Sequence, residues 1–434
     1  MLAASLLTRY LRRVNKRRMR LELMPDLRPP APRTDRDYLL YVHIPFCESL
    51  CPFCPFHKIK LDAGKAVPYF RALAKEIELY RRLGYDFSAL YVGGGTPTVM
   101  PEQLSEILSL IRSLFSIRQI SVETNPNHLR EPALSLLKAA GVNRLSVGVQ
   151  SFDDRLLKEM SRYTSYGSSA EIIERLTHTQ GMFDTLNVDM IFNFPHQSLA
   201  SLQRDIVILT EDIKVDQLSF YPLMASAETQ SAIVQEMGTF TLDREQRFYE
   251  AILESMGSAY VPSTVWCFSR DTSMIDEYVV GYDEYLGVGS GSFSYLDGIV
   301  YASTFSISHY VSRITEGKTA ISARRRLSRR EQMQHDFLFK LFALAIDLET
   351  METKYDNTFL LALWKEFLLF RLLRAIIRNG NGYRLTRRGM YYWVVMMREF
   401  FLGTNNFRDQ MRAGLSAERD LALAENPMRV RPWR

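Results

Sequence analysis

Three of the four cysteines lie close together, in the string CESLCPFC that contains Cys47, Cys51 and Cys54. Four cysteines in 434 residues are too few for a disulfide framework, and this clustering indicates metal or redox chemistry. Thiolates spaced C-x3-C-x2-C can bind three irons of a [4Fe–4S] cube and leave the fourth iron without a protein ligand. Such an open iron can chelate the amino and carboxylate groups of S-adenosylmethionine, which then becomes a source of radicals.

Zinc is the alternative for this loop. A structural zinc ion normally has four protein ligands, so His57 would have to complete the set. The fourth cysteine, Cys267, lies beside Trp266 in the segment STVWCFSR. A catalytic role for Cys267 stays open, although a lone cysteine next to a tryptophan is more often simply buried.

Residues 38–221 supply a scaffold for this chemistry by alternating strand-like and helix-like patterns. The predicted strands cover 38–44, 89–93, 119–124, 144–149, 185–192 and 217–221, and the helices between them include 66–83, 101–114, 131–140 and 168–177. Six such repeats indicate a parallel sheet, and the polar strings HIPFC, GGGTP, ETNP and GVQSF directly follow strands. Parallel β/α barrels carry their active sites at the carboxyl ends of the strands. We therefore predict an α/β fold, namely a partial six-unit TIM-like barrel with a mostly helical C-terminal domain.

The positive charge is concentrated at the N-terminus. Residues 1–36 carry ten Lys and Arg against three acidic residues, while the whole chain has a net charge of +5. The rest is therefore near neutral, which gives no sign of nucleic-acid binding. Leucines recur at helical spacing among these cations and predict a basic amphipathic helix, within residues 1–24, that contacts an anionic membrane surface. Packing of this arm on the protein itself is the alternative.

Changes in pattern predict four parts of the chain: a basic arm with a proline-rich linker (1–36), the strand–helix repeats (37–225), an extension that completes the active site (226–330) and a helical or winged C-terminal domain (331–434). The longest apolar run, 390–402, contains Arg398 and Glu399 and is too short to span a membrane. No secretory signal is evident, so we predict a cytoplasmic protein with peripheral contact at the inner membrane face. The same aromatic run is expected to form a helical core or to cover an apolar substrate.

The motifs YVHIPFC, GGGTPT, NRLSVGVQSF and LGVGSGSFSYLDG together resemble the HemN-like branch of the radical S-adenosylmethionine superfamily, over about residues 38–318. That branch contains oxygen-independent coproporphyrinogen III dehydrogenases, heme chaperones, heme-degrading methyltransferases and class C radical methyltransferases. The resemblance implies that Cys47, Cys51 and Cys54 ligate the cluster and that an electron donor such as flavodoxin or ferredoxin reduces it.

The resemblance also implies a pocket for S-adenosylmethionine after the second and third strands. Gly93, Gly94, Gly95 and Thr96 would let the backbone approach the methionine amino group closely. Glu123 would accept a hydrogen bond from a ribose hydroxyl or from that amino group.

Five further residues would complete this pocket. Gln150 would line it, Arg162 would face the methionine carboxylate and Asp189 the ribose. Phe53 would pack on adenine, and Tyr41 would act as a catalytic residue where HemN-like proteins hold a second S-adenosylmethionine. Plain structural roles stay open, with Asp189 as a strand-end cap and Arg162 as a surface cation.

Departures from the family pattern bear on the function. Pro55, Phe56 and His57 follow Cys54 in place of the continuation expected of coproporphyrinogen dehydrogenases, and only the arginines at 324–326 and 329–330 form basic runs that could hold propionates. We therefore predict a radical methyltransferase that methylates an sp2 carbon of a hydrophobic ring, with menaquinone C8 as the favoured target. The alternatives are a coproporphyrinogen III dehydrogenase or other tetrapyrrole-acting enzyme, and a heme chaperone.

Overall fold

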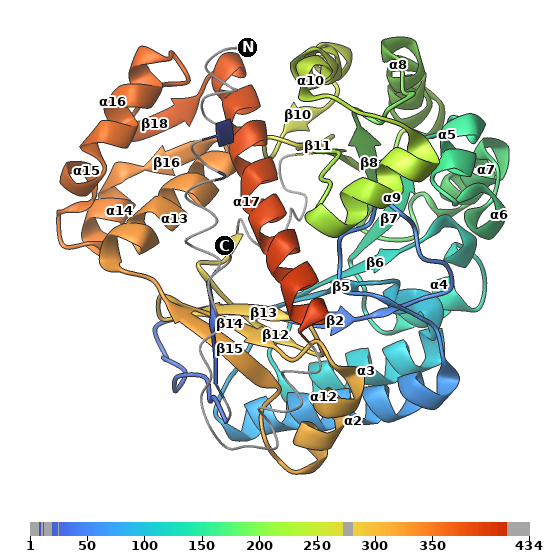
Figure 1. The fold of residues 1–434 in the computed structure, drawn as a ribbon, viewed down its shortest axis with the longest axis vertical. Coiled ribbons are helices and arrows are strands. Elements are labelled where there is room, and N and C mark those ends of the chain that lie inside the picture. Colours follow the sequence, from blue (N-terminus) through green and yellow to red (C-terminus); the bar gives the residue numbers. More distant parts are fainter. Residues whose placement is uncertain (1–7, 10–11, 13–19, 25, 272–280, 415–434) are drawn as a thin grey trace.

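The six predicted strands form one parallel array in a computed structural model that describes residues 8–9, 12, 20–24, 26–271 and 281–414 (Figure 1). They are β2 (Tyr38–Ile44), β5 (Ala89–Gly94), β6 (Gln119–Thr124), β7 (Arg144–Gln150), β8 (Thr185–Phe192) and β9 (Gln217–Pro222). Each strand pairs in parallel with the next in this order. The strand–helix repeats therefore bring six carboxyl ends to one edge, as predicted.

The sheet continues beyond both ends of this array. At one end β12 (Glu284–Val288) pairs in parallel with β2, and the antiparallel strands β13 (Phe293–Leu296), β14 (Ile299–Ser303), β15 (Ile321–Arg326) and β1 (Glu22–Leu23) follow. At the other end stand β11 (Cys267–Ser269) and β10 (Val261–Pro262). The outermost of these thirteen strands, β1 and β10, do not pair with each other, so the barrel stays open across the described chain. The predicted partial barrel is confirmed.

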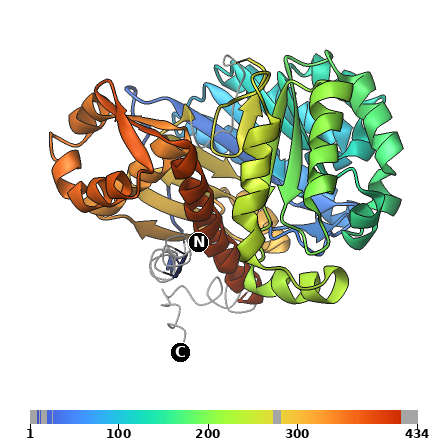
Figure 2. The same ribbon diagram turned by 90° about the horizontal axis from the view of Figure 1, so that it is seen from above.

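Helices cover the outer face of the array (Figures 1 and 2). Three of the expected helices are α2 (Ala63–Arg82), α3 (Pro101–Leu114) and α7 (Ser169–Thr179). Helix α3 begins at the predicted residue, α7 one residue later than predicted and α2 three residues earlier. Asp62 caps α2, and Ser168 forms a capping box with Glu171 at α7. The other helices before residue 316 are α4 (Ala133–Ala139), α5 (Asp154–Glu159), α6 (Tyr163–Tyr166), α8 (Leu199–Val207), α9 (Ala227–Met237), α10 (Glu245–Ser255) and α12 (Ile307–Thr315), with short 3-10 or π turns at Pro97–Val99, Pro126–His128, Ile208–Ile213 and Leu242–Arg244.

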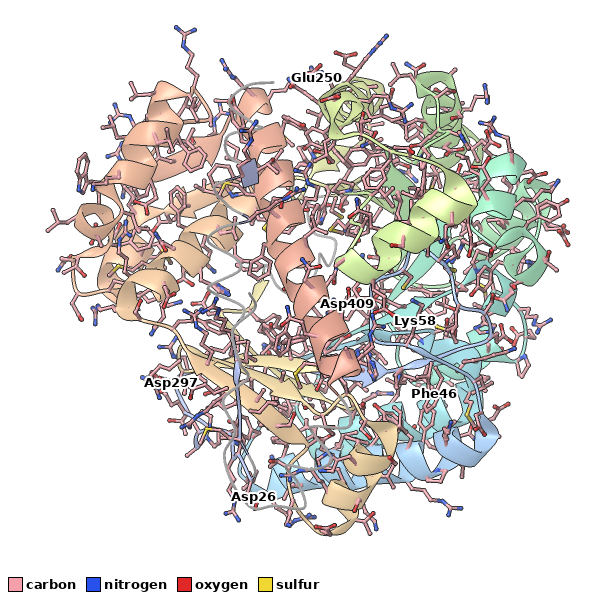
Figure 3. The ribbon with its side chains drawn as sticks, viewed as in Figure 1. Asp26, Phe46, Lys58, Glu250, Asp297 and Asp409 are labelled. Carbon is pink, nitrogen blue, oxygen red and sulfur yellow. The ribbon has the colours of Figure 1, made fainter. Side chains whose placement is uncertain are left out.

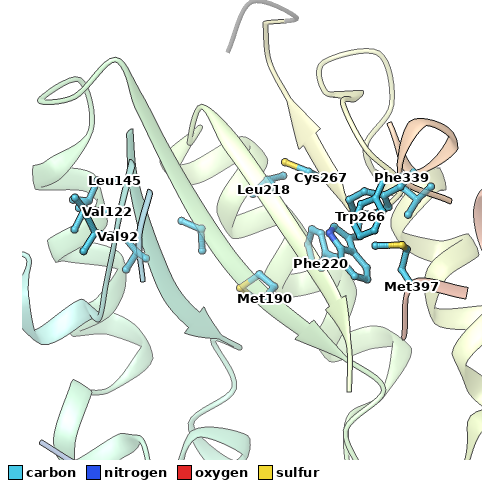
Figure 4. Close-up of a cluster of buried hydrophobic side chains, with 14 of the residues drawn as sticks. Val92, Val122, Leu145, Met190, Leu218, Phe220, Trp266, Cys267, Phe339 and Met397 are labelled. Carbon is cyan, nitrogen blue, oxygen red and sulfur yellow. The ribbon is translucent and has the colours of Figure 1, made fainter. Parts of the chain in front are cut away.

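The face of the array that packs against the helices forms an apolar core (Figure 4). Val92, Val122 and Leu145 are fully buried on neighbouring strands. Cys267 is also fully buried, on β11, with its Sγ 3.6 Å from the Ser219 Oγ. Its burial matches the packing role that was the commoner expectation for this residue.

One buried carboxyl in the fold gives a pH-dependent prediction. Glu76 of α2 accepts hydrogen bonds from the Gly289 amide (2.8 Å) and the Tyr310 hydroxyl (2.7 Å), and burial raises its pKa from 4.5 to about 7. The folded state keeps this proton between those values while the unfolded chain loses it, so the free energy of unfolding falls as pH rises across that window. In Glu76→Gln the free energy of unfolding should fall by about 3 kcal/mol less than in the wild type as the pH rises across that window. Denaturant titrations at several pH values measure this difference.

A matched control for this prediction lies on the same helix. Glu78 is half exposed, and in the described structure its ion pair is with Arg82, at 3.8 Å. Glu78→Gln should leave the pH profile of the unfolding free energy as in the wild type. An unchanged profile in Glu76→Gln would contradict the assignment of this proton to Glu76.

The C-terminal domain is helical with a small sheet, which agrees with the prediction. It contains α13 (Arg329–Phe342), β16 (Ala345–Asp347), α14 (Leu348–Lys354), α15 (Phe359–Ala362), α16 (Trp364–Leu372), β17 (Ile376–Asn379), β18 (Gly382–Leu385) and α17 (Arg387–Ala413). The three strands form an antiparallel sheet in the order β16-β18-β17. The 27-residue helix α17 then runs from this domain across the molecule toward β2 (Figure 1).

The described part of the N-terminal arm packs on α17. Arg12 Nε lies 2.8 Å from the buried Glu399 carboxylate, and Thr8 Oγ1 accepts a hydrogen bond from Arg398 (3.2 Å). These contacts match the alternative in which the arm docks on its own protein, while most of the predicted amphipathic helix lies outside the described residues. In the described ranges, every helix is too short or too polar to cross a bilayer.

Candidate active site at the carboxyl edge of the sheet

A cavity of about 260 Å³ opens at the carboxyl ends of the parallel strands. Twelve of the thirteen predicted site residues line it: Tyr41, Cys47, Cys51, Phe53, Cys54, Gly94, Gly95, Thr96, Glu123, Gln150, Arg162 and Asp189. Gly93, the remaining one, lies directly beneath Glu123, because a Cβ added there would be 2.8 Å from that carboxylate. The structure thus brings together residues that are up to 148 positions apart in the sequence.

The cysteine loop is held by short strands and by polar side chains. Its ends pair as β3 (Phe46–Cys47) and β4 (Ile59–Lys60), and Lys58 donates to the Cys54 carbonyl. Thr96 Oγ1 lies 3.5 Å from Cys47 Sγ, and Arg162 donates to Cys51 Sγ at 3.4 Å. Burial raises the pKa of the Cys47 thiol to about 12, so this thiol needs a bound cation to become a thiolate at neutral pH.

The loop fits an iron–sulfur cube better than a single metal ion. Among the described residues, no three Cys, His, Asp or Glu side chains converge on one ion position. A cube does not require this, because each thiolate binds its own iron. The zinc alternative loses support at His57, whose Nε2 lies 3.3 Å from Ser290 Oγ and whose ring stacks on His43.

The strand end after β5 is built for close approach of the backbone. Gly94 has φ +123°, and a Cβ added to Gly95 would lie 2.7 Å from the Phe46 carbonyl oxygen and 2.9 Å from Cys47 Sγ. A side chain at Gly95 would therefore push on the cysteine loop. The close backbone approach at Gly94 and Gly95 and the three thiols of the cysteine loop are the features of this chain that suit a cluster and a small ligand bound beside it.

Glu123 is fixed at the floor of the cavity. Its carboxylate accepts hydrogen bonds from the Tyr91 hydroxyl (2.9 Å) and the Gly94 amide (3.1 Å). Burial, and then the nearby Asp189 carboxylate, raise the pKa of Glu123 to about 7. Near neutral pH this group can therefore accept or donate a hydrogen bond to a polar ligand with little cost.

Arg162 is buried beside the cysteine loop and is not a surface cation. Only 4% of this residue is exposed. Its guanidinium donates to Asn125 Oδ1 (3.0 Å), to the Gly148 carbonyl and to Cys51 Sγ, and it stacks on Tyr166 at 4.2 Å. Its Nε has no hydrogen-bond partner in the described chain. A buried cation with a spare donor suits the carboxylate of a ligand.

Asp189 and Tyr41 occupy the inner wall. Asp189 accepts from Ser146 (2.7 Å) and Asn187 (2.8 Å), and burial raises the pKa of its carboxyl. The Tyr41 hydroxyl lies 2.9 Å from His43 Nδ1, and burial raises the pKa of Tyr41 well above its ordinary value. These contacts orient both polar groups at the strand ends.

Sequence reasoning missed several residues of this cavity. Tyr91 could have been found, because it lies two residues before Gly93 on one strand and so shares its face. No sequence signal places Arg408 of α17 here, whereas Phe401 of the same helix belongs to the aromatic run 390–402. Figure 3 shows Lys58 of the cysteine loop and Asp409 of α17, and Arg408 of the same helix stacks on Phe56 at 5.1 Å. Of the aromatic run 390–402, Phe401 lines the cavity, while residues 390–399 are buried and match the helical-core alternative.

The basic runs at 324–330 do not contribute to this site. Arg325 pairs with Glu331 at 2.6 Å, Arg329 with Asp356 at 2.6 Å and Arg330 with Glu366 at 2.8 Å. The cations in the described cavity wall are Lys58, Arg162 and Arg408 instead. None of these arginines lines the described cavity, so a role for them in holding propionates stays a prediction.

Comparisons with known proteins identify the architecture. The radical SAM superfamily matches residues 41–206. The heme chaperone HemW of Bacillus subtilis is 27% identical over 321 residues, which cover 69% of this chain and 82% of HemW. The oxygen-independent coproporphyrinogen III oxidase of Pseudomonas aeruginosa is 25% identical over 382 residues, covering 81% and 82%. The solved structure of coproporphyrinogen III oxidase (HemN) from Escherichia coli superposes with a TM-score of 0.72 at 25% identity, covering 85% of this chain and 91% of HemN.

Over most of its length the chain is similar to HemN-like radical SAM proteins, and the radical SAM match itself covers residues 41–206. A [4Fe–4S] cluster and S-adenosylmethionine are implied for a HemN-like protein, and the residues around the cysteine loop fit both. The number of S-adenosylmethionine molecules stays a prediction. The methylation of menaquinone finds no support in these relatives, whose names refer to heme and to coproporphyrinogen.

Proposed function

We propose that this HemN-like protein cleaves S-adenosylmethionine reductively and acts on a tetrapyrrole-type ring bound in the same cavity. The observation that carries the proposal is the aromatic wall that shares the cavity with the cysteine loop. Trp266 packs on Tyr221 at 5.2 Å and on Phe401 at 5.7 Å, and all three residues line the cavity. A flat apolar ring system fits such a wall.

Two cations beside this wall suit a ring that carries carboxylates. Arg408 of α17 and Lys58 of the cysteine loop both line the cavity. Propionate groups of a tetrapyrrole would form charge-assisted hydrogen bonds with such side chains. The relatives named for coproporphyrinogen and heme support the same ligand class.

The remaining site residues take the S-adenosylmethionine in this proposal. When bound and reduced by a flavodoxin or ferredoxin, the cluster supplies the electron for cleavage. Arg162 holds the methionine carboxylate, Glu123 accepts from an amino or hydroxyl group, and Asp189 binds the ribose. Phe53, which packs edge-to-face on Phe194 at 5.7 Å, offers its ring to adenine.

The rest of the pocket follows the same proposal. Gln150, whose Nε2 would lie 3.0 Å from a Cβ added at Gly148, lines the cavity at the end of β7. Tyr41, fixed by His43, would contact a second S-adenosylmethionine or the substrate. The cysteine loop, the strand ends and α17 together would exclude water from the reacting groups.

Two other functions have specific support and are tested by the same experiment. Similarity to HemW over 82% of that protein favours a chaperone that binds heme without turnover. The apolar wall formed by Trp266 and Phe401 would also accept a naphthoquinone, which keeps ring methylation as the second enzymatic candidate.

The test uses anaerobically reconstituted full-length protein with dithionite and S-adenosylmethionine. Coproporphyrinogen III, heme and menaquinone are supplied in separate reactions, and products are identified by mass spectrometry and Soret absorbance. We expect 5′-deoxyadenosine together with a modified tetrapyrrole, because the cavity combines a cleavage site with a wall for a flat ring. A menaquinone heavier by one methylene, with S-adenosylhomocysteine, would replace this proposal by ring methylation. Stoichiometric heme binding without any modified product would replace it by the chaperone function.

A further inference from the structure

Seven of the thirteen large apolar side chains exposed on the described surface fall between residues 360 and 377. They are Leu360, Leu361, Trp364, Leu368, Leu369, Leu372 and Ile377, and we call them the α15–α16 patch. Leu361 and Leu372 are the most exposed, at 75% and 74%. A contiguous apolar surface of this kind on a soluble fold marks a binding surface.

The geometry of α16 sets three of these side chains on one face. Leu368 and Leu372 follow Trp364 by four and eight residues, the spacing of one helix face. The opposite face is filled by Phe367 and Phe370, which are buried against α13 residues such as Phe337. The helix is therefore apolar on both sides, and only one side has a partner in the described fold.

Cations surround the patch. Lys365, Arg371, Arg374 and Arg378 are all exposed, with Lys365 stacked on Trp364 at 5.6 Å. The nearest acidic residue on the helix, Glu366, is already paired with Arg330 at 2.8 Å. The patch thus combines an exposed tryptophan, leucines and an excess of positive charge.

We infer that the α15–α16 patch binds an anionic lipid surface. Leucines and tryptophan enter the headgroup region, while the surrounding lysine and arginine side chains contact lipid phosphates. A second copy of this chain fits the patch poorly, because two such faces would bring equal sets of cations together. This surface is separate from the proposed tetrapyrrole site, so the inference does not depend on that function.

The position of the patch allows such binding. In Figures 1 and 2, α15 and α16 lie at the outer edge of the C-terminal domain. The cavity wall residues Phe401 and Arg408 come from the far end of α17, the helix that follows this domain's small sheet. Lipid binding at α16 therefore leaves the mouth of the cavity uncovered.

The test is sedimentation of the full-length protein with vesicles of phosphatidylglycerol and phosphatidylcholine or of phosphatidylcholine alone, at physiological and high salt. We expect binding to the anionic vesicles that weakens with salt. Leu368→Glu/Leu372→Glu should lower the partition coefficient by about tenfold or more, and Arg371→Glu/Arg374→Glu should lower it by about fivefold for each lost cation.

Matched controls come from other exposed positions. Val207 on α8 and Val234 on α9 are each 43% exposed. The variant Val207→Glu/Val234→Glu therefore tests the effect of two added glutamates outside the patch. Arg71→Glu/Lys75→Glu on the outer face of α2 tests the loss of cations elsewhere. Both control pairs should bind vesicles nearly as the wild type does.

A spectroscopic measurement keeps the test independent of variant folding. Trp266 and Trp393 are buried, whereas Trp364 is 52% exposed. Addition of anionic vesicles to a Trp433→Phe variant, which removes the one tryptophan outside the described residues, should shift tryptophan fluorescence to shorter wavelength, and Trp364→Phe in the same background should abolish that shift.

Three results would overturn the inference. One is wild-type protein that does not sediment with anionic vesicles or shift its fluorescence. Another is vesicle binding that survives Leu368→Glu/Leu372→Glu but disappears on deletion of residues 1–24, which would transfer the role to the N-terminal arm. The third is self-association of the wild type that these glutamates abolish while vesicle binding persists, which would make a second copy the occupant.

Discussion

Cys51→Ala should yield a folded protein without the absorbance of an iron–sulfur cluster and without measurable formation of 5′-deoxyadenosine. The substitution removes one of the three thiolates that a cube takes from this loop, and the cluster is the electron source for cleavage. It also removes the sulfur to which Arg162 donates at 3.4 Å, so the proposed carboxylate ligand loses its orientation. Iron content, the visible spectrum and deoxyadenosine formation measured anaerobically on one preparation test this expectation.

Cys267→Ala is the matched control. Cys267 is fully buried on β11 and does not line the cavity, so its loss should cost about 1–2 kcal/mol of stability while iron content and cleavage stay at wild-type levels. Wild-type cleavage in Cys51→Ala would remove the cluster from the proposal. Lost cleavage with a normal cluster in Cys267→Ala would instead give the fourth cysteine a direct role.

Gly95→Ala should reduce cluster occupancy and S-adenosylmethionine binding by roughly 30-fold. The added Cβ would lie 2.7 Å from the Phe46 carbonyl oxygen and 2.9 Å from Cys47 Sγ, and a backbone atom cannot move aside as a flexible side chain can. Overpacking of this kind costs about 2 kcal/mol, which corresponds to that change in an equilibrium constant. Iron analysis and equilibrium dialysis with labelled S-adenosylmethionine measure the two quantities separately.

Gly281→Ala provides the comparison for this substitution. A Cβ at Gly281 would have no described heavy atom within 4 Å, so the same chemical change should leave both quantities unaltered. If Gly95→Ala binds iron and S-adenosylmethionine as the wild type does, the strand end after β5 is not the close-approach site proposed above.

The sequence by itself determined the local elements, and it predicted twelve of the residues that line the cavity. The strands β2, β6 and β8 begin and end at the predicted residues, because runs of apolar residues that end at glycine, proline and polar residues define short buried strands. Parallel strands place their carboxyl ends at one edge of the sheet, so residues at and directly after those ends lie close together. This is why Tyr41, Glu123 and Asp189 line one cavity even though no local signal links them.

Only the tertiary structure decided how distant segments complete that site. The parallel pairing of β12 with β2 joins Gly287 to Tyr41, and α17 brings Phe401 and Arg408 to the cavity. Helical periodicity shows that a segment has apolar faces, but it does not say which surface each face will meet. That choice depends on packing among all elements at once, which no local pattern encodes.

Because a local pattern does not say which surface an apolar face will meet, the sequence could not tell which apolar segments are buried and which are exposed. Periodic leucines and arginines predicted a membrane contact for residues 1–24, yet Arg12 is paired with the buried Glu399. The apolar run at 390–402 is largely buried along α17, whereas the leucines of α16 remain exposed. Both helices are rich in apolar residues, so composition could not distinguish them. Burial is a property of the neighbours a residue acquires, and those neighbours are fixed only when the whole chain has folded.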